Sequence, residues 1–181
     1  MKLLKFIIII LGIILAFLLT ITAILPSYLK VEKEIVIYAP QNYTYKIIKD
    51  LKSWTKWFTT LKIDRNINIY FSSNNQNKLI WNSSNPNVGN GSIVLTKKIP
   101  ENLIIADLNL QNDKSGKLTF KIVPKSNYCL LKLEFSTKMT FFEKWMGFFL
   151  STIIGPTLEK SLEDIKSISE YQYNKEKNET K

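Results

Sequence analysis

The pattern of apolar and polar positions begins with an uninterrupted apolar run. Residues 6–29, FIIIILGIILAFLLTITAILPSYL, contain no charged side chain. A helix rises about 1.5 Å per residue, so roughly 20 apolar residues cross the hydrocarbon core of a bilayer. The part of the run that ends at Leu25 has this length, and Pro26 terminates the helical pattern. We therefore predict an N-terminal transmembrane anchor within residues 1–29.

A cleaved signal peptide is the alternative interpretation of this run. Its apolar core would be shorter, about 7 to 15 residues, and would end at a small-x-small site, which Ile21-Thr22-Ala23 matches poorly. No cysteine directly follows the run, which excludes a lipoprotein anchor. Lysines lie on both sides of the span, and the positive-inside rule gives a small preference for a cytoplasmic amino terminus. We predict a single-pass protein of the cell membrane whose globular domain is extracytoplasmic.

The next two elements are a strand and a helix. Over residues 31–39 the apolar side chains fall on alternate positions, as in a half-buried strand. Pro40 then opens a helical stretch, PQNYTYKIIKDL, whose apolar residues gather on one face. These residues are Tyr43, Ile47, Ile48 and Leu51. An aromatic segment, DLKSWTKWFTT, follows the helix.

Six apolar runs come next and have the composition of strands. They are NINIYF, Leu79 to Trp81, SIVLTKKI, NLIIADLNL, KLTFKIV and YCLLKLEF. Turn formers separate them, including SSNPNVGNG, Pro100, Gly116 and the pair Ser126-Asn127. Adjacent strands joined by short turns predict an antiparallel meander.

The last pattern has the period of a helix. In STIIGPTLEKSLEDIKSISE an apolar stripe recurs at three- and four-residue steps, at Ile154, Leu158, Leu162, Ile165 and Ile168. The pattern predicts an amphipathic helix of about five turns, whose stripe requires the sheet as its partner. We expect a globular domain over residues 30–172 and a frayed polar tail over 173–181.

Three stretches occur in an order that carries a family resemblance: KEIVIYAPQNYTYKIIKDLKSWTKWF, VGNGSIVLTKKIPENLI and GPTLEKSLEDIKSISE. The first stretch resembles the opening strand, Ala-Pro helix start and Trp-x-x-Trp segment of START-like, Bet v 1-like proteins. The second resembles the Gly-x-Gly-Ser strand of these proteins, and the third resembles the start of their closing helix. This superfamily is also called SRPBCC, for polyketide cyclase/dehydrase and lipid transport. Leu25-Pro26 is similar to the end of the hydrophobic segment in its membrane-anchored bacterial members. Thr55 and Ser161 depart from the Pro and Gly that are common there.

The resemblance implies an α+β helix-grip fold, in which a curved antiparallel sheet wraps a long C-terminal helix and leaves a cavity between them. Such a cavity suits a hydrophobic small molecule or lipid, because burial of apolar surface gains about 25 cal/mol per Å². The aromatic segment DLKSWTKWFTT, which we call the Trp-rich segment, would close one end of the cavity. The segment that contains Phe141 and Phe148 would form the opposite lip of the cavity. The candidate ligand-binding residues are Trp54, Trp57, Phe58, Trp81, Phe120, Leu131, Leu133, Phe135, Phe142, Trp145, Phe149 and Leu158.

Some candidates also have a purely structural interpretation. Trp54 and Trp57 are typical of core and rim packing as well as of ligand contact. TFFEKWMGFFL, residues 140–150, fits core packing first, and a gate or an interfacial segment touching the bilayer second. Cys129 lies in an apolar strand without a nearby base, which indicates a buried structural thiol.

Composition narrows the possible chemistry. The formal net charge of +10 suits an anionic partner, but no run of five like charges occurs, which indicates a solvated surface. The aromatic residues are not interleaved along a strand face, so we expect no nucleic-acid partner. The chain has no histidine and one cysteine, which excludes an intrachain disulfide and a Cys/His metal site. We expect no metal and no cofactor.

The sequence contains no recognisable catalytic constellation. Asp107 is the one carboxylate in the middle of an apolar strand, and we expect it to face outward and pair with a lysine of the next strand. Catalysis is therefore disfavoured, although a cyclase or aromatase type of enzyme stays open. We predict a membrane-anchored binding module for a hydrophobic small molecule or lipid. The alternative is a protein-interaction or chaperone-type module that uses the same fold without a ligand.

Overall fold

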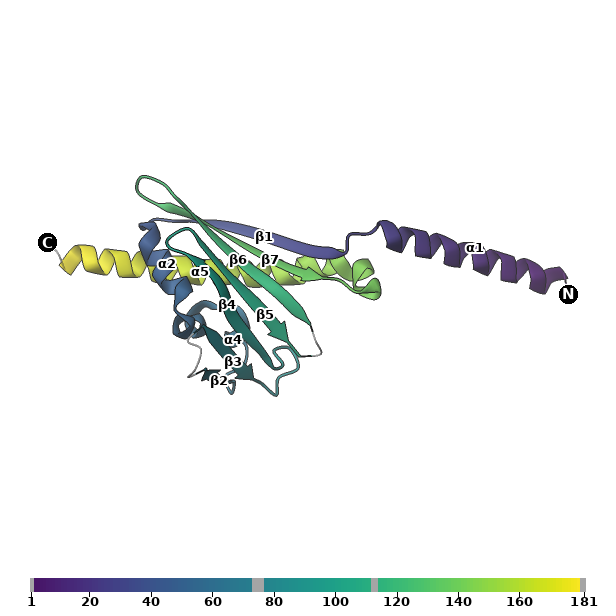
Figure 1. Ribbon diagram of the computed structural model, residues 1–181, viewed down its shortest axis with the longest axis horizontal. Helices are drawn as coiled ribbons and strands as arrows, with labels where there is room; N and C mark the ends of the chain where they lie inside the picture. The colour runs from purple at the N-terminus through teal and green to yellow at the C-terminus, as the bar shows by residue number, and fades with distance from the viewer. Residues whose placement is uncertain (1, 73–76, 112–113, 180–181) are drawn as a thin grey trace.

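An antiparallel sheet forms the framework of the domain in the computed structural model, which describes residues 2–72, 77–111 and 114–179 (Figure 1). Its seven strands are β1 Tyr28–Ile37, β2 Asn68–Phe71, β3 Lys78–Asn82, β4 Gly91–Ile99, β5 Leu103–Leu110, β6 Ser115–Pro124 and β7 Cys129–Lys138. Their order in the sheet is β1-β7-β6-β5-β4-β3-β2, so β2 to β7 are consecutive neighbours. The predicted antiparallel meander is confirmed, and β1 closes the sheet against β7.

Glycines in the sheet serve close packing rather than chain reversal. We predicted Gly116 as a turn residue between strands, whereas it lies inside β6 and pairs with Thr137 of β7. A Cβ atom at Gly116 would lie 2.4 Å from Cε2 of Phe135, so only glycine lets that ring approach the strand. The strand therefore begins earlier than the apolar pattern indicated.

Short helices link β1 to the meander. They are α2 Gln41–Lys49, the 3-10 turn η1 Leu51–Ser53, α3 Trp54–Trp57 and α4 Thr59–Lys62. The predicted apolar face of α2 is confirmed, since Ile47 and Ile48 are buried and Tyr43 packs against the core from its edge. Leu51, which we predicted on the same helix, is buried in η1. This arrangement brings the Trp-rich segment onto the sheet.

The C-terminal helix α5, Phe141–Glu179, is 39 residues long and lies along the sheet (Figure 1). We predicted a helix over residues 151–170, and the structure extends it at both ends without interruption at Pro156. The expected frayed tail is helical up to Glu179, because Tyr173 packs on Tyr43 with ring centroids 5.4 Å apart. Residues 180–181 of that tail lie outside the described residues.

The interior between α5 and the sheet contains most of the apolar side chains. The predicted stripe is confirmed: Leu158, Leu162 and Ile165 are buried, and Ile154 and Ile168 pack at its margins. Together with this stripe, the curved antiparallel sheet and long closing helix give the domain the α+β helix-grip fold.

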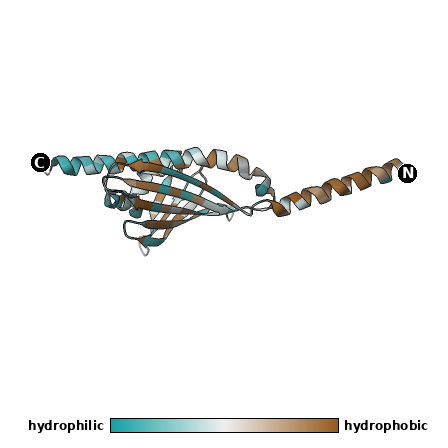
Figure 2. Ribbon diagram, turned by 90° about the horizontal axis from the view of Figure 1, so that it is seen from above, coloured by the Kyte–Doolittle hydropathy of each residue, from teal (hydrophilic) through white to brown (hydrophobic). Residues whose placement is uncertain are grey.

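The N-terminal helix α1, Lys2–Ile24, projects away from the domain (Figure 1). Residues Leu3–Ile24 are long and apolar enough to cross a membrane, and almost none of this surface is covered by the rest of the protein. Figure 2 shows apolar residues concentrated on α1 and on the first half of α5, whereas the second half of α5 is polar. The two apolar helical regions meet at the same end of the domain.

Candidate functional site

The sequence-predicted pocket residues fall into two groups that the structure places apart. The first group lies in the core between the sheet and α5. It comprises Trp54, Trp57, Phe58, Trp81, Phe120, Leu131, Leu133 and Leu158, with Phe135 packed against its edge. The second group, Phe142, Trp145 and Phe149, is exposed on the first turns of α5. The two predicted lips therefore do not face each other across one cavity.

Side chains fill the interior around the first group. The rings of Trp54 and Trp57 contact each other at a tilt of 47° with centroids 4.4 Å apart, and Phe120 meets both edge-on at 5.6 and 5.8 Å. A hollow that admitted a water molecule would leave accessible surface on its walls, yet Trp54, Trp57, Trp81 and Phe120 have none. A ligand at this position would require the Trp-rich segment or α5 to move. Binding by these residues stays a prediction.

The indole nitrogens support the packing interpretation of the first two tryptophans. Trp54 Nε1 donates to the carbonyl oxygen of Ile48 at 2.8 Å, and Trp57 Nε1 donates to Ser53 Oγ at 3.1 Å. Trp81 Nε1 is buried without a hydrogen-bond partner among the described residues. The first two rings are thus fixed by their own segment, as core residues are.

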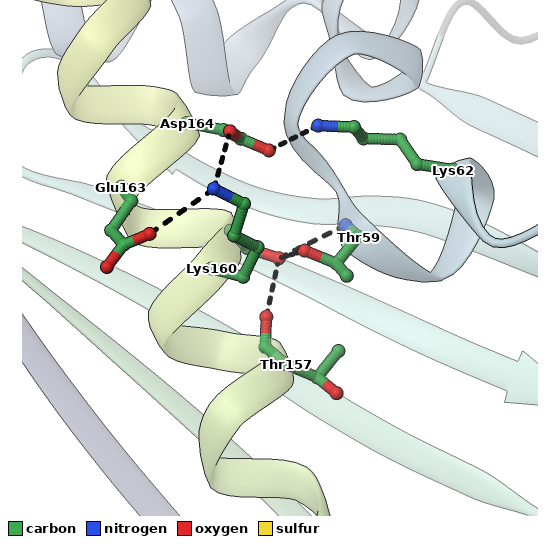
Figure 3. A network of polar contacts seen from close by, with 7 residues as sticks. Thr59, Lys62, Thr157, Lys160, Glu163 and Asp164 are labelled. Carbon is green, nitrogen blue, oxygen red and sulfur yellow. Dashed lines mark hydrogen bonds and ion pairs between the residues drawn. The ribbon is translucent and has the colours of Figure 1, made fainter.

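A hydrogen-bonded network fastens the Trp-rich end to α5 (Figure 3). Ser161 Oγ lies 3.0 Å from Thr59 Oγ1, accepts from the Thr59 amide at 3.2 Å, and donates to the Thr157 carbonyl at 2.9 Å. Beside it, Lys62 Nζ pairs with Asp164 at 2.5 Å. The hydroxyl of Ser161 therefore joins α4 to α5.

Two polar groups of the strands have structural surroundings. Cys129 is buried, its Sγ lies 3.4 Å from Thr44 Oγ1, and burial raises the pKa of the thiol, which disfavours the reactive thiolate. Asp107 lies on the outer face of β5 directly opposite Lys117 of β6, as the sequence predicted. Neither residue is presented to a hollow between the sheet and α5.

An apolar hollow of about 510 Å³ lies where the N-terminal helix α1 meets the domain. The end of α1, the start of β1, Met139 and the first turns of α5 surround it. Its lining residues are Ile21, Leu25, Pro26, Tyr28, Leu29, Lys30, Met139, Lys144, Trp145, Gly147 and Ser151. Of the sequence-predicted candidates, Trp145 is the one that lines it. The hollow thus lies at one end of the sheet–helix interface and not in its centre.

Hydrogen bonds between distant segments fix the walls of this hollow. Trp145 Nε1 donates to Thr22 Oγ1 at 2.9 Å, and Lys144 Nζ donates to the Thr22 carbonyl at 3.3 Å. The Met139 amide donates to the carbonyl of Ser27 at 2.9 Å. The last turn of α1 is therefore held against α5 by polar contacts within otherwise apolar surroundings.

Basic side chains stand at the rim of the hollow. Lys30 pairs with Glu134 of β7 at 2.8 Å, and the hydrogen bond to this carboxylate raises the pKa of Lys30. Lys144 reaches the end of α1, where helix carbonyls lack partners within the helix. The hollow thus combines apolar walls with two ammonium groups at its edge.

The start of α5, which forms one wall, is fixed by a capping box. Glu143 Oε2 accepts from the Thr140 amide at 2.8 Å, and Glu143 Oε1 pairs with Lys114 at 2.9 Å. These contacts lower the pKa of Glu143 to about 2, with the backbone hydrogen bond as the largest cause. The Thr-x-x-Glu signature was present in the sequence and marks this helix start, which our sequence interpretation missed.

Two further hollows are more polar than this one. One of about 860 Å³ lies between the end of α2 and the β2–β3 hairpin and is lined by Lys49, Lys52 and Lys98 among others. The other, about 560 Å³, lies on the outer face of the sheet beside Asp107 and Lys117. Of these three hollows, the one beside α1 is thus the one whose walls are mainly apolar and include α1.

Solved structures share this fold at low sequence identity. SA2116 from Staphylococcus aureus, a protein of unknown function, has a TM-score of 0.65 and 9% identity, over 80% of this chain and 95% of that chain. The di-domain ARO/CYC StfQ from the steffimycin biosynthetic pathway has a TM-score of 0.62 and 10% identity, over 80% of this chain. The match covers 51% of StfQ, so the present chain spans about half of that protein.

These similarities establish the fold and no more. The neighbours share the helix-grip fold that the sequence motifs predicted. The sequence matches no protein-family model and none of the curated proteins. The chain therefore has a helix-grip domain, preceded by an apolar helix that is long enough to span a membrane.

Proposed function

We propose that this chain is a single-pass membrane protein whose helix-grip domain binds a hydrophobic small molecule or lipid beside the bilayer. The observation that carries the proposal is the apolar hollow between β1, α5 and the end of α1, which we call the juxtamembrane hollow. Its volume, about 510 Å³, lies within the range of roughly 300–1,000 Å³ that is typical of small-molecule sites. A hydrophobic molecule that enters this hollow from the bilayer need not cross water.

The same hollow supports retention of α1 as an anchor. Ile21 and Leu25 form part of its wall, and Thr22 accepts hydrogen bonds from Lys144 and Trp145. Removal of α1 as a signal peptide would leave the indole and ammonium groups without these acceptors and open the wall. We further propose that the domain is extracytoplasmic, on the basis of the lysines that precede the span.

Photo-crosslinking with a diazirine-bearing fatty acid tests the proposal on the full-length protein in membrane vesicles. We expect saturable labelling of Met139, Gly147 or Ser151, the residues that line the hollow. Leu25→Trp replaces a leucine of the wall with a larger indole ring that narrows the hollow, and it should abolish this labelling. Ile24→Trp is the matched control, because Ile24 is adjacent in sequence but 79% exposed.

Labelling confined to the lipid-facing side of α1, equal in all three proteins, would refute the proposed binding site. Labelling of the interior residues Trp54, Trp57 or Phe120 instead would also refute the proposed binding site and would show that the molecule binds in the centre of the sheet–helix interface. The latter result would require the packed interior to open on binding.

A second candidate function is a protein-interaction module that needs no ligand. The filled interior favours it, because the side chains that would bind a ligand in the centre of the fold contact one another instead. Its signature is a stoichiometric protein partner that co-purifies with Leu25→Trp as well as with the unmodified chain. An enzymatic function has less support, since Asp107 faces outward and burial keeps the Cys129 thiol protonated.

A further inference from the structure

The first turns of α5 expose a concentration of large apolar side chains. Between Phe141 and Ile153 six of them are 43% to 79% exposed. They are Phe141, Phe142, Trp145, Met146, Phe149 and Ile153. The Phe148 side chain lies outside the described residues. Exposed apolar residues scattered singly are normal, whereas a continuous group on one element marks an interaction surface.

These six side chains share one face of the helix. At 100° per residue their positions fall within an arc of about 140°. On the opposite side, Leu150 and Ile154 pack against the core, and Glu143 pairs with Lys114. The helix is therefore attached to the domain by one side and presents the other, apolar side outward. We call this exposed side, residues 141–153, the aromatic face.

The aromatic face begins at the end of the anchor. Trp145 is hydrogen-bonded to Thr22 in the last turns of α1, and Figure 1 shows the start of α5 next to the end of α1. From Phe141 to Met146 the helix rises by about 7.5 Å. The headgroup region of a bilayer is about 5–8 Å thick on each side. A chain that spans the membrane with α1 thus has the start of the aromatic face at the level of this region.

We propose that the aromatic face is a second membrane contact, whose start inserts into the interfacial region of the same bilayer that α1 crosses. Aromatic rings with a polar atom favour this zone, where the ring is desolvated and the indole N–H keeps a partner. The contact fixes the orientation of the domain and turns the juxtamembrane hollow toward the lipid. The inference rests on the membrane anchoring in the proposed function but not on the bound ligand.

Tryptophan fluorescence provides a selective probe of this contact. The chain contains four tryptophans, and three of them, Trp54, Trp57 and Trp81, are 0% exposed, whereas Trp145 is 43% exposed. Quenchers that require contact therefore report on Trp145. The full-length protein is reconstituted into vesicles of phosphatidylcholine and phosphatidylglycerol, with either brominated acyl chains or iodide in the water as the quencher.

We expect brominated lipid to remove the emission of Trp145, with the largest effect when bromine is near the headgroup end of the chain, and iodide to have little effect. The lipid-quenched component should be absent from Trp145→Phe. Quenching by iodide alone would overturn the inference, because Trp145 would then lie in water. Protection from both quenchers would also overturn it and would indicate a protein partner on this face.

A second variant removes the contact without removing the probe. Phe142→Asp combined with Phe149→Asp should shift Trp145 from lipid quenching toward iodide quenching, since a carboxylate resists insertion into the interface. Tyr171→Asp is the matched control, because Tyr171 is 68% exposed on the distant part of α5 and should leave both quenching values unchanged. An unchanged double variant would contradict the inference.

These outcomes are separable from failure of the proposed function. Resistance of the protein to alkaline extraction from membranes reports on α1, and fatty-acid labelling of Met139 reports on the hollow. A protein that stays in the membrane and is labelled at Met139, but whose Trp145 is quenched by iodide, retains the proposed function and lacks the second contact. A protein released by alkaline extraction lacks the anchor, and the second contact is then rejected with it.

Discussion

Trp145 and Thr22 are 123 residues apart in the chain and are joined by a hydrogen bond of 2.9 Å from the indole Nε1 to the threonine Oγ1. The threonine hydroxyl donates in turn to the carbonyl of Leu18 at 2.8 Å. The two bonds connect Trp145, in the wall of the hollow beside α1, to the backbone of α1. Movements of α1 and of the first turns of α5 are therefore coupled.

Thr22→Val tests this coupling. Valine preserves the shape of the side chain and removes the acceptor, so the Trp145 indole loses its partner at a cost of about 1 kcal/mol. We expect faster amide hydrogen exchange over residues 141–151 in the variant. Thr20→Val is the control, because Thr20 bonds only within α1, to Ala16 at 2.8 Å. Equal exchange in both variants would show that the Trp145 bond does not hold the wall.

Gly91→Ala tests the packing of the interior. A Cβ at this position would lie 2.3 Å from Trp81 Cζ2 and 2.7 Å from the carbonyl oxygen of Asn109. Because the ring is buried and the backbone cannot yield, we expect a loss of about 1–3 kcal/mol in the free energy of unfolding. Denaturant unfolding of the full-length protein in micelles measures it.

Gly155→Ala is the matched substitution with the opposite expectation. Gly155 lies within α5, and its nearest contact is the flexible Cε of Lys33 at 3.4 Å. Alanine favours the helix by about 0.5–1 kcal/mol over glycine, so this variant should be neutral or stabilised. Equal losses in Gly91→Ala and Gly155→Ala would contradict the packing described around Trp81.

Ser161→Ala tests the network that fastens α4 to α5 (Figure 3). The substitution removes the acceptor of the Thr59 amide and the partner of the Thr59 hydroxyl, which should cost about 1–3 kcal/mol. In a double-mutant cycle with Thr59→Ala, the two losses should be less than additive, because both variants remove the same contact. Ser167→Ala, at an exposed position of the same helix, serves as the control and should change stability little.

Glu143→Gln tests the capping box by its pH dependence. The pKa of Glu143 is lowered from 4.5 to about 2, so the charge stabilises the folded protein fully above pH 4.5, and this contribution is lost as the pH falls through about 2. The variant lacks this contribution. We expect the thermal midpoints of the two proteins to differ at neutral pH and to converge between pH 4.5 and 2. Parallel curves over this range would contradict the assignment.

Much of the fold could be predicted from the sequence because its determinants are local. Alternation identified the strands of the meander, and the stripe from Ile154 to Ile168 identified the closing helix. The early start of α5 was also encoded locally, in the Thr140–Glu143 capping box, but we followed the apolar stripe and placed the start of the helix near residue 151. The structure shows that Pro156 is accommodated within α5.

The candidate site was less predictable because it depends on contacts between distant segments. Whether the interior is hollow depends on how closely Trp54 and Trp57 pack against Phe120, which lies more than sixty residues later in the chain. No pattern in either segment specifies the distance between these rings. The juxtamembrane hollow arises only when α1 and α5 come together through Thr22 and Trp145. Sequence reasoning identified Trp145 as a ligand candidate but assigned it to a different cavity.

The most direct test of the account is a mass-spectrometric inventory of the small molecules that stay bound to the full-length protein after extraction from its native membrane. We expect an apolar molecule in stoichiometric amount with the unmodified protein and with Ile24→Trp, and its loss from Leu25→Trp, whose ring narrows the hollow. Identical inventories of bulk lipid from all three proteins would contradict the central claim that this domain binds a hydrophobic molecule where it meets its anchor.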